Sequence, residues 1–136
     1  MAKARGKKKI LLFGATGTIG RAVLAERNSQ GNKVVCVIRP GSAGELSTGT
    51  LTVEADVTDA DAMRAVFTKD TFDAVISCMA SRSGAPADTW AIDHHANSLA
   101  LTGAKFAGIE QFIMLSAICV QKPRLAFQHA KLAFER

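Results

Sequence analysis

The sequence predicts an α/β fold, a doubly wound parallel sheet with the strand order 3-2-1-4-5. Short apolar runs rich in β-branched residues alternate with segments of helical length, as in chains that build a parallel sheet through right-handed crossovers. A glycine-rich turn, GATGTIG, joins the first apolar run to the first helical segment. The composition, 48% hydrophobic and 21% charged, is that of an ordinary globular chain. We expect a ligand at the carboxyl ends of the strands, where the strand order reverses.

Five apolar runs have the length and continuity of strands that are buried on both faces of a sheet. In chain order, they are Lys9–Phe13 (KILLF), Lys33–Ile38 (KVVCVI), Thr50–Glu54 (TLTVE), Phe72–Ser77 (FDAVIS) and Gln111–Ser116 (QFIMLS). Turn residues at Gly31–Asn32 and Gly41–Gly44 bound the second run. Each run is therefore expected to form one strand.

Three helices are expected between the strands, at Ile19–Asn28, Ala60–Phe67 and Asp88–Ala107. Asp59 has the side chain of an N-cap for the second helix, and Gly108 is expected to end the third. Trp90, Leu101 and Ala104 fall on one face of the third helix if its turns are regular, so we expect them to contribute to a buried stripe.

The chain ends at Glu135–Arg136, within a segment that has the character of the helix after the fifth strand. A complete sheet of this class usually continues further. We therefore expect residues 9–136 to form an incomplete domain, truncated before the later strands and without its substrate-binding part. Residues 1–8 are expected to be a disordered basic tail.

The net charge of +5 comes from the N-terminus. The first nine residues contain no acid and five bases, Lys3, Arg5, Lys7, Lys8 and Lys9, and the remaining residues balance twelve bases against twelve acids. Such a tail can touch anionic lipid or nucleic acid, but a short basic tail is more often solvated, so no nucleic-acid partner is predicted. No segment approaches the ~18 apolar residues of a membrane span, and no secretory signal is recognisable.

Three cysteines, Cys36, Cys78 and Cys119, lack C-x-x-C spacing and lie in or beside apolar runs. Free thiols in a reduced cytosol are therefore expected rather than a disulfide framework. His94 and His95 are adjacent on a helix, so their side chains point about 100° apart and do not chelate one metal together. No metal site is predicted.

Gly14, Gly17 and Gly20 follow the first strand directly and open the first helix with the spacing GxxGxxG. Gly14 allows the tight turn, Gly17 lets the backbone approach a pyrophosphate, and Gly20 lets the helix pack closely on the sheet. Amide groups at the helix start, those of Thr18 and Ile19 among them, would then face the phosphates. A glycine-rich turn without a ligand is the alternative, but three glycines in one turn cost backbone entropy that a plain connection avoids.

The end of the second strand predicts the cofactor, because Arg39 stands there in VIRPGS. A carboxylate at this point would bind a ribose 2′-hydroxyl and repel a 2′-phosphate, whereas a guanidinium binds a phosphate dianion bidentately. NADPH is therefore the expected cofactor. A solvated arginine before a proline turn is the alternative.

Ser116 follows the fifth strand and Lys131 lies fifteen positions later. This layout, with the GxxGxxG spacing, resembles the short-chain dehydrogenase/reductase superfamily, whose members have a proton-donating tyrosine four residues before the lysine. Phe127 stands at that position, and the chain contains no tyrosine. Either the site only binds a nucleotide, or the reaction needs no phenolic acid. Hydride addition to an electron-poor C=C bond, with the carbanion delocalised into a conjugated ring, fits the second reading.

Four segments are more specific than the glycine turn: LSAICVQKP from Leu115, FQHAKLAFE from Phe127, SCMASRSG from Ser77 and DTWAIDHHA from Asp88. Together they closely resemble the divinyl chlorophyllide and protochlorophyllide 8-vinyl reductases, atypical NADPH-using members of the superfamily in chlorophyll and bacteriochlorophyll synthesis. The likeness covers residues 10–136. It looks closest to the bacterial, non-plastid branch because no transit peptide is recognisable. A cytoplasmic location is expected, with at most peripheral association at photosynthetic membranes.

The resemblance implies a Rossmann domain and NADPH-dependent reduction of the 8-vinyl group of a tetrapyrrole to ethyl, with Lys131 and Ser116 as the catalytic residues. Lys131 would hold the nicotinamide ribose, and Ser116 would lie beside the nicotinamide. Lys131, or a water that it orients, is the preferred proton donor, with Lys122 and His129 as further candidates. By position, the pyrophosphate would meet Gly14, Thr16, Gly17, Thr18, Ile19 and Gly20, the 2′-phosphate Arg39, the adenine Asp56 and Val57, and the cofactor ribose Ala80 and Ser81, with Arg82 nearby.

Three alternatives stay open. Asp56 can simply cap a turn. The whole protein can be a non-catalytic NADP(H)-binding sensor or assembly protein of the same type, which the missing tyrosine would fit, or a reductase of another conjugated substrate. Because the expected substrate-binding part lies beyond Arg136, we expect the 136-residue chain alone to be inactive. The sequence does not indicate an oligomeric state.

Overall fold

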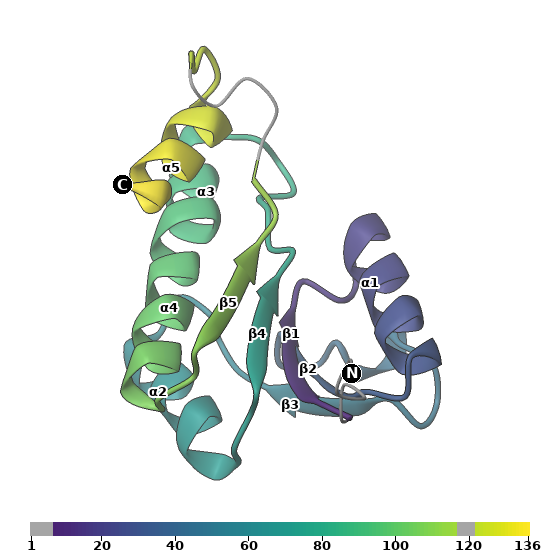
Figure 1. Cartoon of the computed structure of the whole chain (residues 1–136). Helices are drawn as coiled ribbons and strands as arrows, with labels where there is room; N and C mark the ends of the chain where they lie inside the picture. The colour runs from purple at the N-terminus through teal and green to yellow at the C-terminus, as the bar shows by residue number, and fades with distance from the viewer. Residues whose placement is uncertain (1–6, 117–121) are drawn as a thin grey trace, which may run out of the picture.

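The structure is a computed structural model that describes residues 7–116 and 122–136. Its centre is a five-stranded parallel sheet with the order β3-β2-β1-β4-β5, which confirms the predicted fold class and strand order (Figure 1). Each predicted run contains one strand, and the last three strands are one or two residues shorter than their runs. The strands are β1 (Lys9–Phe13), β2 (Lys33–Ile38), β3 (Leu51–Glu54), β4 (Ala74–Ser77) and β5 (Gln111–Met114).

Burial of the strands differs between the centre and the edges of the sheet. In β1 and β2, all residues after the first are buried. The expectation of burial on both faces is wrong for β3 and β5, where Leu51 is 45% exposed and Ile113 is 46% exposed. The physical reason is that these are the edge strands, each with one neighbour in the sheet.

Helices lie on both faces of the sheet (Figure 1). On one face, Ile10 and Leu12 of β1 pack in a core with side chains of α1. On the other face, Leu11 and Phe13 join a larger core with α2 and α4. The helical elements are α1 (Thr18–Ser29), the 3-10 helix η1 (Ala43–Glu45), α2 (Ala60–Lys69), α3 (Pro86–Thr89), the π-helix η2 (Trp90–Ala96), α4 (Asn97–Phe106) and α5 (Ala126–Glu135).

The third predicted helix is three consecutive elements rather than one regular helix. Seven residues of π-helix stand between α3 and α4. The wider π turns rotate successive side chains by a smaller angle than α turns do, so the regular spacing used to place Trp90 fails. Ala104 is buried as predicted and Leu101 is half-buried, but Trp90 is 43% exposed, so its predicted place in the buried stripe is wrong.

The two predicted end signals, Asp59 and Gly108, are confirmed, while α1 extends one residue beyond its predicted range at each end and α2 extends two residues beyond its predicted end. The Asp59 carboxylate accepts a hydrogen bond from the Asp61 amide at 3.2 Å and caps α2. Gly108, with φ of +73°, follows the C-terminal end of α4.

Every helix among the described residues is too short or too polar to cross a lipid bilayer. Of the predicted basic tail, residues 1–6 lie outside the described part, and the Lys8 carbonyl accepts a hydrogen bond from the Lys33 amide at 2.9 Å.

Candidate functional site

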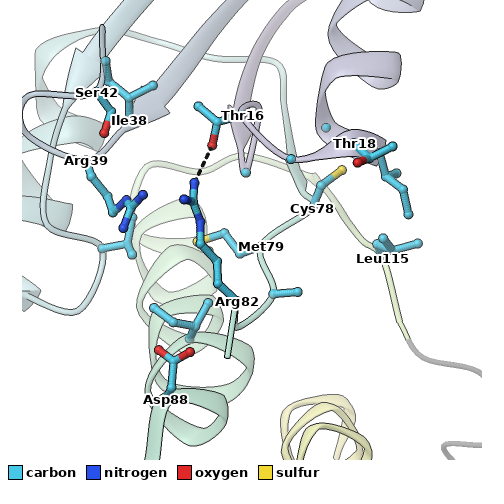
Figure 2. A pocket seen from close by; sticks show the side chains of 17 residues that line it. Thr16, Thr18, Ile38, Arg39, Ser42, Cys78, Met79, Arg82, Asp88 and Leu115 are labelled. Atoms are coloured by element: carbon cyan, nitrogen blue, oxygen red, sulfur yellow. Dashed lines mark hydrogen bonds between the residues drawn. The ribbon is translucent and has the colours of Figure 1, made fainter. Parts of the chain in front are cut away.

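The first cavity, of about 430 Å³, lies at the carboxyl ends of β1, β2 and β4, where the strand order reverses (Figure 2). This is the place where the sequence predicts a ligand. Most of the residues predicted to bind the cofactor line it: Gly14, Thr16, Gly17, Thr18, Ile19, Gly20, Arg39, Val57 and Ala80.

The glycine turn brings the N-terminus of α1 to this cavity. Gly14 has φ of +81°, and Gly17 is the N-cap of α1 without a side-chain cap, so the first amides of the helix are left for a ligand. A Cβ at Gly20 would lie 1.8 Å from the Gly14 carbonyl oxygen, which explains why glycine is needed where the helix meets the turn. A Cβ at Gly17 would meet only the same oxygen, at 3.6 Å. Gly17 is therefore free of a packing role.

Gly17→Ala should separate binding from stability. Because the added methyl makes only an ordinary contact within the protein, unfolding in urea should show a loss of about 1 kcal/mol or less. The methyl would occupy the space through which a pyrophosphate approaches the backbone, so affinity for NADPH in calorimetry should fall about tenfold or more. Unchanged affinity would contradict the predicted role of the glycine turn.

Arg39 and Arg82 bring two cations to the first cavity. Arg39 follows β2 and is exposed, and no described residue forms an ion pair or hydrogen bond with its guanidinium. Arg82 follows β4, donates a hydrogen bond to the Thr16 hydroxyl at 3.4 Å, and lies 4.0 Å from the Glu45 carboxylate. The sequence places Arg82 only near the cofactor, because the loop after β4 has no pattern that predicts the direction of its side chains.

Asp56 does not line the first cavity. Its carboxylate accepts hydrogen bonds from the Thr58 hydroxyl at 2.7 Å and the Thr58 amide at 2.9 Å. These bonds, the hydroxyl first, lower the pKa of Asp56 below its usual value. The carboxylate thus caps a turn, as the sequence allows, and its contact with adenine stays a prediction.

A second cavity of about 420 Å³ adjoins the first, and Met79, Ala80, Arg82 and Leu115 line both. The structure brings Ser116, Phe127 and Lys131 together in its wall, and Ser81 joins them. The Ser116 hydroxyl donates a hydrogen bond to the Glu135 carboxylate, so the segment that follows β5 meets α5 at this point. The second cavity therefore has the lysine and serine of the superfamily layout and an apolar ring in place of the phenol.

Lys131 is buried, with 4% of its surface exposed, and it is held by two groups. Its ammonium donates a hydrogen bond to the Met79 carbonyl at 3.0 Å and lies 3.3 Å from the Asp93 carboxylate. Asp93 is 1% exposed, and its other carboxylate oxygen accepts a hydrogen bond from the Ser81 amide at 3.2 Å. The pair keeps a cation at the wall of the second cavity, since a buried charge needs a partner.

Sequence reasoning missed Asp93 as a functional residue. It lies in η2, whose geometry a search for regular helices does not predict. One signal was present: Asp93 is three residues before Ala96 and seven before Ala100, on a stripe where it is the one charged residue. An acid on a buried stripe indicates a paired charge.

Buried polar side chains hold η2 in place. The side-chain amide of Asn97 donates hydrogen bonds to the backbone carbonyls of Asp93, at 3.0 Å, and Ile92, at 3.4 Å. The Ser77 hydroxyl, at the end of β4, donates to the Asn97 side-chain oxygen. These bonds join the π-helix to the sheet, so they fix the position of the Asp93 carboxylate.

The start of α5 fixes the position of Lys131. The Gln128 side-chain oxygen accepts hydrogen bonds from the Arg124 amide at 2.9 Å and the Leu125 amide at 3.1 Å. Gln128 is itself buried, and one helical turn separates it from Lys131. The glutamine of the FQHAK segment thus anchors the helix that carries both Phe127 and Lys131.

The described thiols are protonated at neutral pH. Burial raises the pKa of Cys36 to about 11, and burial also raises the pKa of Cys78 against an opposing effect of the Lys131 charge. Both are free, as predicted, while Cys119 lies outside the described residues. Neither described thiol therefore has the low pKa of a nucleophilic cysteine.

The geometry supports nucleotide binding next to a site for a second molecule. The first cavity offers backbone amides and two guanidinium groups, which suit phosphates. The second offers a buried cation and a hydroxyl beside an aromatic ring. Because the two cavities share walls, a ligand that begins on the glycine turn can extend to Lys131.

Comparison with known proteins agrees with this arrangement. The chain is similar to the chloroplastic divinyl chlorophyllide a 8-vinyl-reductases of Oryza sativa subsp. indica, with 41% identity over 97% of this chain and 35% of that protein, and of Arabidopsis thaliana, with 40% identity over 93% and 33%. It therefore spans about a third of the length of these curated relatives.

Among solved structures, UDP-glucose 4-epimerase from Thermotoga maritima has the same fold, with a TM-score of 0.82 and 21% identity over 93% of this chain and 48% of that one. The model of the family described as NAD(P)H-binding matches residues 14–135, which include the glycine turn, both cavities and α5. The chain belongs to the NAD(P)H-binding family.

Proposed function

We propose that this chain is the NADPH-binding part of an oxidoreductase that reduces the 8-vinyl group of divinyl chlorophyllide or protochlorophyllide to ethyl. The observation that carries the proposal is Phe127, which lines the second cavity with Ser116 and Lys131 where a carbonyl reductase would need a phenol. The similarity to divinyl chlorophyllide a 8-vinyl-reductases supports the choice of substrate.

The proposed reaction adds two hydrogens across a C=C bond. Held at the glycine turn and Arg39, NADPH would supply the hydride for one vinyl carbon, and the conjugated tetrapyrrole would delocalise the electron pair displaced from the double bond. A proton then completes the other carbon. The Lys131 ammonium, at the wall of the second cavity, would supply this proton, directly or through a water. Solvent would then restore the proton to Lys131, whose ammonium lies 3.3 Å from the Asp93 carboxylate.

Arg39 supports NADPH over NADH as the cofactor, because it lines the first cavity and no described residue neutralises it. Arg39→Asp should weaken NADPH binding about a hundredfold, since a charge-assisted bidentate contact becomes a repulsion, while NADH binding should change little. Calorimetry with both nucleotides measures this. Equal losses for NADPH and NADH would show that Arg39 does not read the 2′-phosphate.

The activity is tested with the longest natural chain that carries this sequence, incubated with NADPH and divinyl chlorophyllide while the Soret band is followed. The expected result is a Soret shift as the vinyl group leaves the conjugated system. Tight NADPH binding without any spectral change would favour the non-catalytic sensor. A change with another conjugated compound but not with divinyl pigments would favour a reductase of a different substrate.

A further inference from the structure

Two arginines enter the first cavity from opposite walls. In Figure 2, Arg39 reaches in from the end of β2 and Arg82 from the loop after β4, and their guanidinium groups point toward one another. Like charges that face each other in one cavity repel, and an anion between them would turn that repulsion into two attractions. The cavity therefore holds two charges of the same sign that an anionic ligand would stabilise.

The contacts of Arg82 in the structure are weak. Its hydrogen bond to the Thr16 hydroxyl is long, at 3.4 Å, and the Glu45 carboxylate is 4.0 Å away at an exposed edge. The two side chains of that ion pair are 65% and 44% exposed, and exposed pairs contribute little stability. A stronger anion would readily replace Glu45 as the partner of Arg82.

Arg82 lies near the place where the adenosine ribose of a nucleotide would bind. Thr16 belongs to the glycine turn that would hold the pyrophosphate, and Arg39 directly follows β2, the strand at whose end ribose substituents are read. A guanidinium between these two positions can reach a phosphate on the 2′ position. Glu45 is held at the same edge, since its carbonyl accepts a hydrogen bond from Arg21 of α1 at 3.3 Å.

We infer that Arg82 is a second specificity-determining residue for a 2′-phosphorylated adenine nucleotide, which it binds opposite Arg39, and that the 2′-phosphate displaces Glu45 from Arg82. The inference rests on the proposed NADPH function. A dianion between two guanidinium groups balances their charge, and each guanidinium supplies a charge-assisted contact that a 2′-hydroxyl lacks.

The test compares ligands that differ only in the 2′-phosphate. NADPH is compared with NADH, and adenosine 2′,5′-bisphosphate with adenosine 5′-monophosphate, by calorimetry at low ionic strength because salt screens exposed charges. Arg82→Gln should lower affinity for the two phosphorylated ligands about tenfold or more and change affinity for the other two about twofold or less. Glu45→Gln should raise affinity for the phosphorylated ligands about threefold, because it removes a competing anion.

A matched control removes the same charge far from the cavity. Arg64→Gln lies on the exposed face of α2, where Arg64 pairs with Asp61 at 3.4 Å, and it should leave all four affinities unchanged. Thermal unfolding of each variant checks that the fold is intact; since Arg82 is mostly exposed, its replacement should not alter the midpoint. A drop caused by the loss of overall positive charge would appear equally in Arg64→Gln and would overturn the inference.

The outcomes separate this inference from the proposed function. Selective loss of the phosphorylated ligands in Arg82→Gln supports the inference. Equal loss of all four ligands, or no loss, overturns it while leaving NADPH as the cofactor if wild type and Arg39→Asp behave as expected. A wild-type protein that shows no preference for the 2′-phosphate overturns both.

Discussion

Lys131→Met should destabilise the fold by about 3–5 kcal/mol, because it leaves the Asp93 carboxylate buried without its cation. Lys131 and Asp93 join α5 to η2 across the wall of the second cavity, so the loss should loosen the attachment of α5 to the rest of the domain. Urea denaturation followed by circular dichroism measures the change in the free energy of unfolding.

A double-mutant cycle isolates the ion pair. The double variant Lys131→Met with Asp93→Asn removes both charges and should recover most of the stability that Lys131→Met loses. Lys105→Met is the control, since Lys105 is exposed on α4 and its replacement should change stability by about 0.5 kcal/mol or less. If the stability losses of Lys131→Met alone and Asp93→Asn alone simply add in the double variant, the two side chains are not coupled.

Gly20→Ala should cost about 3 kcal/mol. A Cβ at this position would lie 1.8 Å from the Gly14 carbonyl oxygen and 2.9 Å from the Ala15 Cα, both backbone atoms, so α1 would have to move away from the turn. Because α1 covers the core around Leu12, the movement would also open that core. The urea midpoint should therefore fall well below that of wild type.

Gly44→Ala is the matched control for this substitution. A Cβ at Gly44 would have open space within 4 Å, and φ there is outside the positive range, so alanine should be neutral or stabilise the fold by about 0.5 kcal/mol. A Gly20→Ala midpoint equal to that of Gly44→Ala would show that α1 does not pack on the turn as described. Reduced nucleotide affinity in Gly20→Ala would follow from the displaced helix N-terminus rather than from a direct contact.

The architecture and the position of the first cavity could be predicted from local patterns. Continuous apolar runs predict the five strands, and the GxxGxxG spacing predicts the turn after the first strand. A parallel sheet with right-handed connections allows few strand orders, and the observed order is one of them. Ser116, Phe127 and Lys131 could be grouped because two of them share a helix and the third follows the fifth strand. The shorter bounds of β3, β4 and β5 and the exposure of the two edge strands could not be predicted, since hydrophobicity does not reveal where strand pairing stops or which strands have a neighbour on each side.

Tertiary packing decided how the charges of the two cavities are arranged. Asp93 meets Lys131 because seven residues of π-helix turn its carboxylate toward α5, and regular periodicity contains no information about such turns. Arg82 faces Arg39 because the loop after β4 passes beside the glycine turn, which depends on the order of the strands rather than on the residues of the loop. Strands, helices and turns follow from hydrophobic and glycine patterns that are local in the sequence. The partner of a charged side chain depends on elements that are distant in the sequence and come into contact only in the folded protein.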